Sequence, residues 1–132
     1  MHAAPQDSRP LSPHLGIYRW QITMAGSILH RMTGVALYAG AAVLVMWLWA
    51  AAYDAHFYQF LHGALGAWYG QAALVGWTLA FYYHLCNGIR HLVWDMGYGF
   101  TLPVARRTGW LVVISACALT ALTWCIATLP EL

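Results

Sequence analysis

Three apolar segments, separated by shorter polar stretches, dominate the pattern along this chain. Each is close to the roughly 20 residues that an α-helix needs to cross the hydrocarbon layer of a membrane. All five prolines lie outside these segments, so none of them interrupts a helix. The segments cover residues 34–52, 67–89 and 109–129.

This pattern predicts an all-α fold, an integral membrane bundle of three transmembrane helices that forms one domain over residues 1–132. Extended to their polar boundaries, the predicted transmembrane helices cover about 28–52, 67–93 and 109–129. Residues 1–27 form an N-terminal segment with charged residues, three prolines and no continuous apolar stretch, which is unlike a secretory signal peptide. We therefore expect the first helix to remain in the mature protein.

The composition agrees with a membrane protein. Of all residues, 61% are hydrophobic and only 8% are charged, against roughly 25% charged residues in soluble domains. The chain has no glycine-rich phosphate loop and no basic nucleic-acid patch, so no nucleic acid partner is expected. Three cysteines inside apolar segments are predicted to be packing thiols, and no Cys-x-x-Cys-His motif would attach a haem covalently.

The basic residues, all of them arginine, fall on one side of the predicted membrane. The other side consists of residues 53–66, which we expect to form an outer loop with His56 and His62 as surface histidines, and of the C-terminus. Neither part contains arginine or lysine. The positive-inside rule then predicts a cytoplasmic N-terminus and a periplasmic C-terminus. We expect the arginines around the second connection to be ordinary flanking residues that reach toward headgroups, namely Arg90, Arg106 and Arg107.

His84 is the histidine that lies deepest in a predicted span. It precedes Trp94 by ten residues and is therefore up to ~15 Å from the inner boundary. An ionisable side chain at that depth indicates a functional site, either a haem ligand or a proton relay, although a neutral histidine bonded to another helix is the structural alternative. Since no other histidine lies as deep, a second axial haem ligand would come from another chain. Small residues spaced four apart would permit close helix approach, at Ala36 and Gly40 and at Gly66 and Gly70.

Two polar stripes converge at the inner end of the first two helices. They consist of Ser27, His30, Arg31 and Gly34, and of His84, Gly88, His91 and Asp95. A haem at His84 would direct its propionates toward the cationic group formed by His30, Arg31 and His91. Gly88 would leave room for a flat macrocycle or, alternatively, for close helix packing.

Ser27 and Arg31 suggest a second site at the same end. A hydroxyl and a guanidinium could hold a quinone carbonyl and stabilise the charge that develops during its reduction. On sequence alone, the favoured interpretation of Ser27 is a helix N-cap.

Two motifs carry a family resemblance. The first joins Arg9 and Pro10 to residues 27–34, which read SILHRMTG, and the second covers residues 84–97, which read HLCNGIRHLVWDMG. The chain closely resembles the larger cytochrome b membrane-anchor subunit of succinate dehydrogenase, respiratory complex II.

The resemblance implies roles for individual residues. His84 would be the axial ligand of haem b iron, with the second ligand supplied by a smaller anchor subunit. His30, Arg31 and His91 would contact the propionates, while Ser27 and Arg31 would contribute to a ubiquinone pocket.

The resemblance also implies the surroundings of this chain. Its partners would be the second anchor, an iron–sulfur subunit and a flavoprotein subunit on the bacterial cytoplasmic (inner) membrane. Electrons from succinate oxidation in the tricarboxylic acid cycle would pass to quinone, and this chain alone would have no catalytic activity.

Other functions remain as alternatives. The chain could be the anchor of a quinol:fumarate reductase or a haem-free structural anchor. A proton-conducting subunit is disfavoured because no second acidic or histidine site continues outward from His84.

Overall fold

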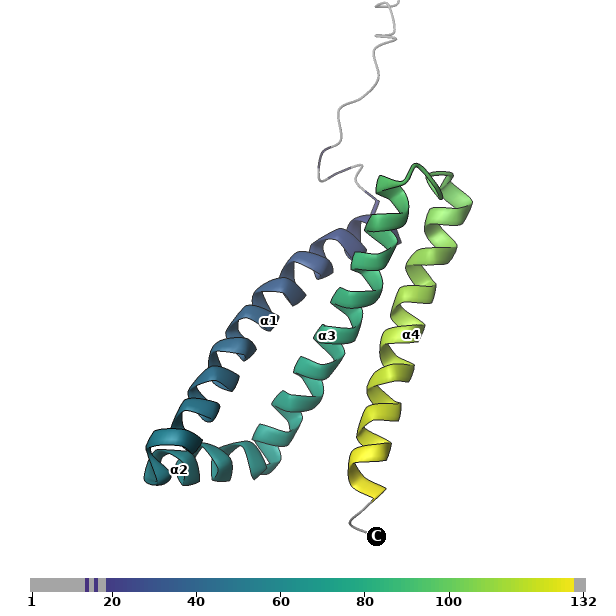
Figure 1. The fold of residues 1–132 in the computed structure, drawn as a ribbon. Coiled ribbons are helices and arrows are strands. Elements are labelled where there is room, and N and C mark those ends of the chain that lie inside the picture. The colour runs from purple at the N-terminus through teal and green to yellow at the C-terminus, as the bar shows by residue number, and fades with distance from the viewer. Residues whose placement is uncertain (1–13, 15, 17–18, 130–132) are drawn as a thin grey trace, which may run out of the picture.

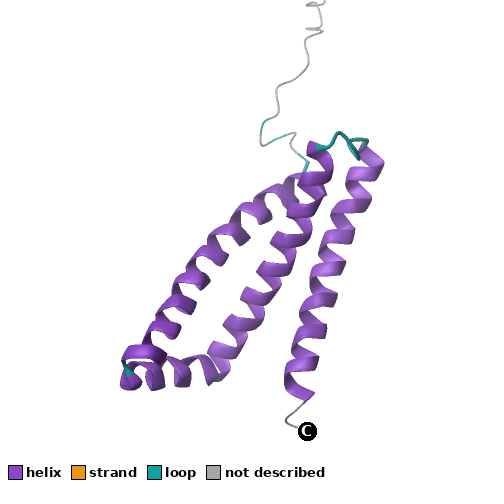
Figure 2. Ribbon diagram, in the orientation of Figure 1, coloured by secondary structure: helices purple, strands orange, loops and turns teal. Residues whose placement is uncertain are grey.

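The structure is a computed structural model that describes His14, Gly16 and residues 19–129. This part of the chain is helical, as predicted (Figures 1 and 2), and contains α1 (Ile22–Tyr53), α2 (Ala55–Gly66), α3 (Trp68–Asp95) and α4 (Leu102–Thr128). The predictions for residues 1–13, including the motif residues Arg9 and Pro10, lie outside the described residues.

The three long helices run in alternating directions. At one end α1 begins, α3 ends and α4 begins, and here α1 and α3 lie close together (Figure 1). The two helices then diverge toward the opposite end, where α2 connects them. α4 runs beside the second half of α3 and separates from it toward the beginning of α3, so α3 is the central helix (Figure 1).

Among the described helices, α1 and α4 are long and apolar enough to cross a membrane, with mean hydropathies of 1.9 and 2.1 in their most apolar windows. Only 6% of the most apolar stretch of α1 is buried within the chain, so α1 is not the core helix of a soluble protein. The side chains on its outer surface are large and apolar, such as Val35, Val45 and Leu48. Such an extended apolar surface requires lipid or a partner subunit around it.

α3 is less apolar than its neighbours because it carries polar side chains along its 28 residues. They include Gln71, His84, Asn87, Arg90 and His91. At 1.5 Å per residue the helix is about 42 Å long, enough to cross a bilayer in length. Its polar residues are concentrated near the end that lies against the start of α1 (Figure 1).

The first connection, between α1 and α3, contains a helix where the sequence predicted an outer loop. Asp54 has extended backbone angles and its Oδ1 accepts a hydrogen bond from Phe57 N at 2.9 Å, which caps α2. The capping residue therefore turns the chain sharply after α1 and starts α2 at once. The prediction that residues 53–66 form only a loop is wrong.

The helix limits also differ from the predicted spans. α1 begins at Ile22 rather than near residue 28, with Gln21 at its N-cap. α4 begins at Leu102 rather than near 109, with a proline in its first turn, where no backbone donor is lost. Both helices therefore extend beyond the apolar segments at this end of the molecule.

α3 ends on a glycine-dependent cap. Gly97 has φ = 88°, Gly97 N donates to Trp94 O at 2.7 Å and Tyr98 N donates to Val93 O at 3.2 Å. This pair of hydrogen bonds is a Schellman motif, which needs a left-handed residue after the helix. The final glycine of the HLCNGIRHLVWDMG segment thus fixes where α3 stops and where the chain turns toward α4.

Candidate functional site

Three histidines meet where α1 and α3 lie close together. The rings of His30 and His84 are stacked, with centroids 4.0 Å apart and planes 12° from parallel. The His91 ring is 5.3 Å from that of His30. The two stripes predicted from helical spacing therefore face each other, and we call these three residues the histidine cluster.

The hydrogen bonds of His84 define its tautomer. His84 Nδ1 lies 3.2 Å from the backbone oxygen of His30, and a carbonyl oxygen can only accept, so Nδ1 carries the hydrogen. Thr33 Oγ1 is also 3.2 Å from Nδ1, while its own hydroxyl lies 2.9 Å from backbone oxygens of α1 to which it can donate. The lone pair of the imidazole is consequently on Nε2, which is the form that binds a metal.

Glycines shape the two sides of this arrangement. A Cβ atom at Gly34 would lie 3.2 Å from Cε1 of His84, so the absence of a side chain lets the ring rest against α1. At Gly88, by contrast, a Cβ atom would meet nothing within 4 Å among the described residues. Close packing of a helix within this chain is therefore not the reason for Gly88. The open surface fits a flat group or a partner subunit.

His30 has a polar atom whose hydrogen-bonding capacity is unsatisfied. Its Nδ1 is buried and has no hydrogen-bond partner among the described residues. A buried ring nitrogen without a partner is uncommon and calls for an explanation such as an absent ligand. Together with Nε2 of His84 and the open surface at Gly88, it makes the cluster compatible with a haem and its propionates.

Ser27 and Arg31 lie on α1 one turn apart, at the same end of the molecule. Ser27 is half-buried and Arg31 is exposed, and neither side chain has a hydrogen-bond partner among the described residues. The N-cap interpretation of Ser27 is wrong because α1 begins at Ile22, so Ser27 lies in its second turn. Its hydroxyl is thus free of the capping role that would have accounted for it.

The prediction that Arg90 reaches toward headgroups is wrong. Arg90 is only 7% exposed and does not reach toward headgroups. Its three nitrogens donate to Ala105 O at 2.8 Å, to Thr108 Oγ1 at 3.1 Å and to Asn87 Oδ1 at 3.3 Å. The guanidinium also lies 4.0 Å from the ring centroid of Trp94. Arg90 therefore joins α3 to α4 immediately beside His91.

Sequence reasoning missed several residues that hold the site together. Tyr83 is buried and its hydroxyl donates to Gly26 O at 3.1 Å, which ties α3 to the beginning of α1. Thr33 supports His84, and Asn87 supports Arg90. Thr33 follows His30 by three residues and Asn87 precedes Arg90 by three, so one-turn spacing from a charged or aromatic site residue was the available signal.

The remaining polar residues lie apart from the cluster. His56 and His62 are exposed on α2, as expected of surface histidines, and Asp95 is the exposed last residue of α3. The three cysteines are free thiols, as predicted, but Cys117 and Cys125 are exposed and do not pack within this chain, whereas Cys86 is half-buried.

Comparison with known proteins finds similarity along most of the chain. The model of the family described as succinate dehydrogenase/fumarate reductase transmembrane subunit matches residues 5–123. A succinate dehydrogenase cytochrome b556 subunit from Rickettsia felis is 48% identical over 118 residues, which are 89% of this chain and 92% of that protein. The cytochrome b556 subunit of Paracoccus denitrificans is 36% identical over 88% of this chain and 89% of its own length. The mitochondrial cytochrome b560 subunit from Sus scrofa is 42% identical over 81% of this chain and 64% of its own length.

Proposed function

This chain belongs to the succinate dehydrogenase/fumarate reductase transmembrane subunit family, and we propose that it binds haem b together with a second, smaller anchor subunit and helps to form the site where ubiquinone is reduced. It is a cytochrome b subunit of the succinate dehydrogenase complex, and the enzymatic activity belongs to that complex rather than to this chain alone. The observation that carries the haem proposal is the hydrogen bond from His84 Nδ1 to the His30 carbonyl, because it leaves Nε2 as a ligand.

In this proposal His84 would hold the haem iron from this chain. Haem b, when bound, supplies a one-electron carrier within the membrane. Thr33 and the His30 carbonyl hold the imidazole in the orientation and tautomer that ligation requires. With the proposed orientation, His30, His91 and Arg31 would lie on the cytoplasmic side of the ligand or at its level and would offer donors to the propionates. The second axial ligand would come from the smaller anchor subunit.

Ser27 and Arg31 form the contribution of this chain to the quinone pocket. They share one face of α1, four residues apart, so a hydroxyl and a guanidinium are presented together. The Ser27 hydroxyl would donate to a quinone carbonyl oxygen, and Arg31 would stabilise negative charge on that oxygen during reduction. Other subunits would close the pocket around the ring.

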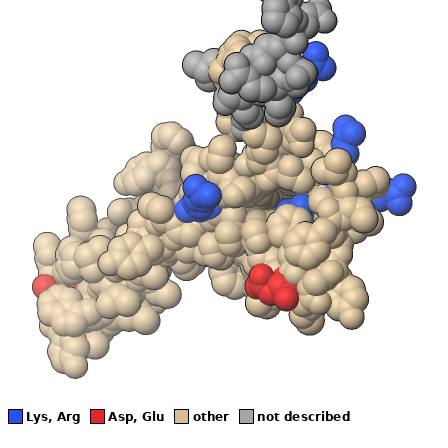
Figure 3. Space-filling view, turned by 90° about the horizontal axis from the view of Figure 1, so that it is seen from above, with Lys and Arg blue, Asp and Glu red and all other residues tan. Residues whose placement is uncertain are grey.

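Three spans, α1, α3 and α4, are proposed to cross the bacterial cytoplasmic membrane. Figure 3 looks down on the end where α1 and α4 begin and shows basic side chains distributed over it. The positive-inside rule assigns that end to the cytoplasm, with the C-terminus in the periplasm. The iron–sulfur and flavoprotein subunits would dock at the same end and deliver electrons from succinate near Ser27. α2 would then lie at the outer surface.

Two variants of the complex test the haem proposal. His84→Ala should remove the haem absorption bands, whereas His62→Ala, on the exposed side of α2, should leave them unchanged. Haem is quantified per copy of this subunit in the purified complex, so that a low yield of complex is not mistaken for loss of ligand. An unchanged spectrum in His84→Ala would exclude His84 as the ligand, and a wild-type complex without haem would identify a structural anchor instead.

The direction of the reaction separates the remaining enzymatic alternative. The family includes anchors of fumarate reductases, in which electrons run from quinol to fumarate. Comparison of succinate oxidation with fumarate reduction by the same purified complex distinguishes the two. Faster fumarate reduction would favour the quinol:fumarate reductase assignment.

A further inference from the structure

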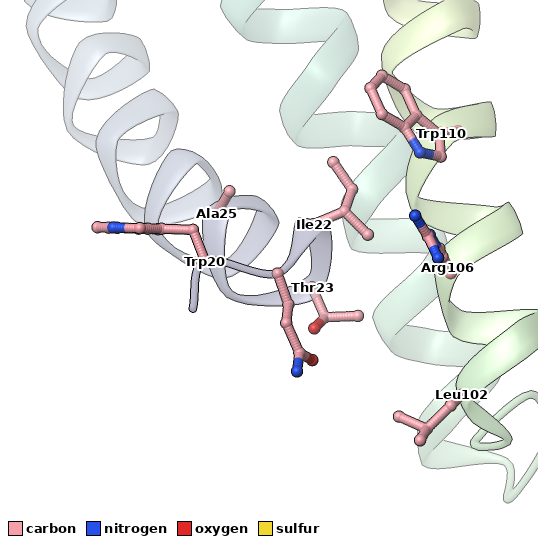
Figure 4. Close-up of a pocket in the computed structure, with 8 residues that line it drawn as sticks. Trp20, Ile22, Thr23, Ala25, Leu102, Arg106 and Trp110 are labelled. Atoms are coloured by element: carbon pink, nitrogen blue, oxygen red, sulfur yellow. The ribbon is translucent and has the colours of Figure 1, made fainter. Parts of the chain in front are cut away.

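A cavity lies between the beginning of α1 and the beginning of α4, apart from the histidine cluster. Its volume is about 570 Å³, and none of the three clustered histidines lines it. Figure 4 shows Ile22 and Thr23 on the α1 side, opposite Arg106 and Trp110 on the α4 side. The cavity is thus formed by the N-terminal ends of two helices that are far apart in the sequence.

One wall of this cavity is a single face of α4. Leu102, Arg106 and Trp110 are spaced four residues apart and line it in order. At 1.5 Å per residue, Arg106 is about 6 Å from the start of the helix and Trp110 about 12 Å. A basic side chain followed one turn deeper by a tryptophan is typical of a helix that passes from the headgroup region into the hydrocarbon layer.

The polar part of the cavity is positively charged. Arg106 is exposed and has no hydrogen-bond or ion-pair partner among the described residues. No acidic side chain lines the cavity, and Thr23 and Gln21 add a hydroxyl and an amide. The N-terminal end of the α1 dipole is positive and lies at the same cavity. The first turn of α1 contains no acidic residue that would offset it. An anionic oxygen group is the complement of this arrangement.

The rest of the cavity is apolar. Ile22, Ala25 and Trp110 line it, and Trp110 is 52% exposed. A free phosphate ion would leave these surfaces uncovered, whereas an amphiphile with an anionic head and an acyl chain would cover both parts. We infer that this cavity binds an anionic membrane phospholipid, with its phosphate on Arg106 and an acyl chain against Trp110 and Ile22.

The inference depends on insertion of α1 and α4 in a membrane and not on the haem or the quinone. The test uses the complete complex in phosphatidylcholine nanodiscs that contain a minor fraction of phosphatidylglycerol. Native mass spectrometry counts the phosphatidylglycerol retained after release from the nanodisc. Arg106→Gln should retain about fivefold less, the effect expected for one arginine at a membrane surface.

Arg107→Gln is the matched control, because Arg107 is an exposed neighbour that does not line this cavity. It should retain phosphatidylglycerol like the wild-type complex. Ala25→Leu, which fills the cavity but keeps Arg106, should lose the lipid as Arg106→Gln does. Equal retention by the Arg106 and Arg107 variants, whether high or low, would overturn the inference.

Two further outcomes would assign the cavity to a different occupant. Displacement of the lipid by inorganic phosphate would show that the site takes a free anion. A photoreactive residue at position 110 should crosslink to lipid, and crosslinking to the iron–sulfur subunit or to a quinone analogue instead would overturn the inference. Haem absorption measured on the same preparations should stay constant, which keeps this test separate from the haem proposal.

Discussion

The ring of His30 lies flat on the ring of His84, and the backbone carbonyl of His30 accepts the Nδ1 hydrogen of the same neighbour. One residue of α1 therefore both packs against and orients the imidazole of α3. An imidazole held by packing and by a hydrogen bond would lose little freedom on binding haem iron as proposed, so this arrangement would favour ligation by His84.

Thr33 should contribute a smaller share of this orientation. In Thr33→Val the Oγ1 contact with His84 is lost while the His30 carbonyl remains, so haem should be retained but released faster. The loss of a hydrogen bond that contributes about 1 kcal/mol net should make haem transfer to an excess of apomyoglobin roughly fivefold faster. Thr128→Val is the control, because that hydroxyl bonds only to its own helix. Equal transfer rates in the two variants would contradict the role of Thr33.

Ser27 and Arg31 should affect quinone chemistry selectively. Ser27→Ala and Arg31→Leu are expected to slow ubiquinone reduction by on the order of tenfold or more, because a donor to the developing oxyanion is lost. Electron transfer from succinate to a soluble dye should be unchanged, since it does not use this pocket. Arg107→Leu should change neither rate. A parallel fall of both activities would indicate defective assembly rather than quinone binding.

Arg90 should be necessary for the packing of α3 on α4. Arg90→Leu leaves Thr108 Oγ1 and Asn87 Oδ1 without the guanidinium donor, at about 1–3 kcal/mol for each buried group that stays unsatisfied. The Ala105 carbonyl loses one donor and keeps the Thr108 hydroxyl as another. The thermal midpoint of the complex should fall clearly. Arg90→Lys should restore only part of it, because an ammonium cannot reproduce the guanidinium fork.

Arg107→Leu is the control for Arg90, as it removes the same charge from an exposed position on α4. It should leave the thermal midpoint near the wild-type value. If Arg90→Leu and Arg107→Leu gave the same midpoint, the network seen around Arg90 would not be stabilising.

Gly40 should be required for the approach of α1 to α3. A methyl group at this position would overlap the indole of Trp77, so Gly40→Ala should destabilise the complex by about 1–3 kcal/mol. Gly76→Ala is the control, because a Cβ atom there meets nothing within 4 Å. It should be neutral or slightly stabilising, as alanine favours a helix by about 1 kcal/mol over glycine.

A double variant isolates the contact between the two residues. Gly40→Ala with Trp77→Phe should recover much of the stability lost in Gly40→Ala, because the smaller ring frees the space of the indole. Additive losses in the double variant would show that Gly40 acts in some other way.

Much of the site could be predicted because helical spacing is a local property. The intervals of three and four residues in the SILHRMTG segment were enough to place Ser27, His30 and Arg31 on one face of α1. The same argument placed His84, Gly88 and His91 on one face of α3. The sequence also predicted that small residues such as Gly40 and Gly70 allow close helix approach. In the structure, Gly40 packs against the indole of Trp77 of the same chain, and Gly70 packs on the backbone of Ala64 and Leu65.

The sequence by itself determined that the chain is helical and apolar and that its polar side chains lie in stripes, because these properties depend on residues within a few turns of one another. Only the tertiary structure decided that Arg90 is buried rather than directed to headgroups, since its acceptors come from α4, a separate helix. It also decided that His30 stacks on His84 and that Arg106 faces the start of α1. Contacts between helices depend on how each one is rotated and on what its neighbour offers, and no local pattern contains that information.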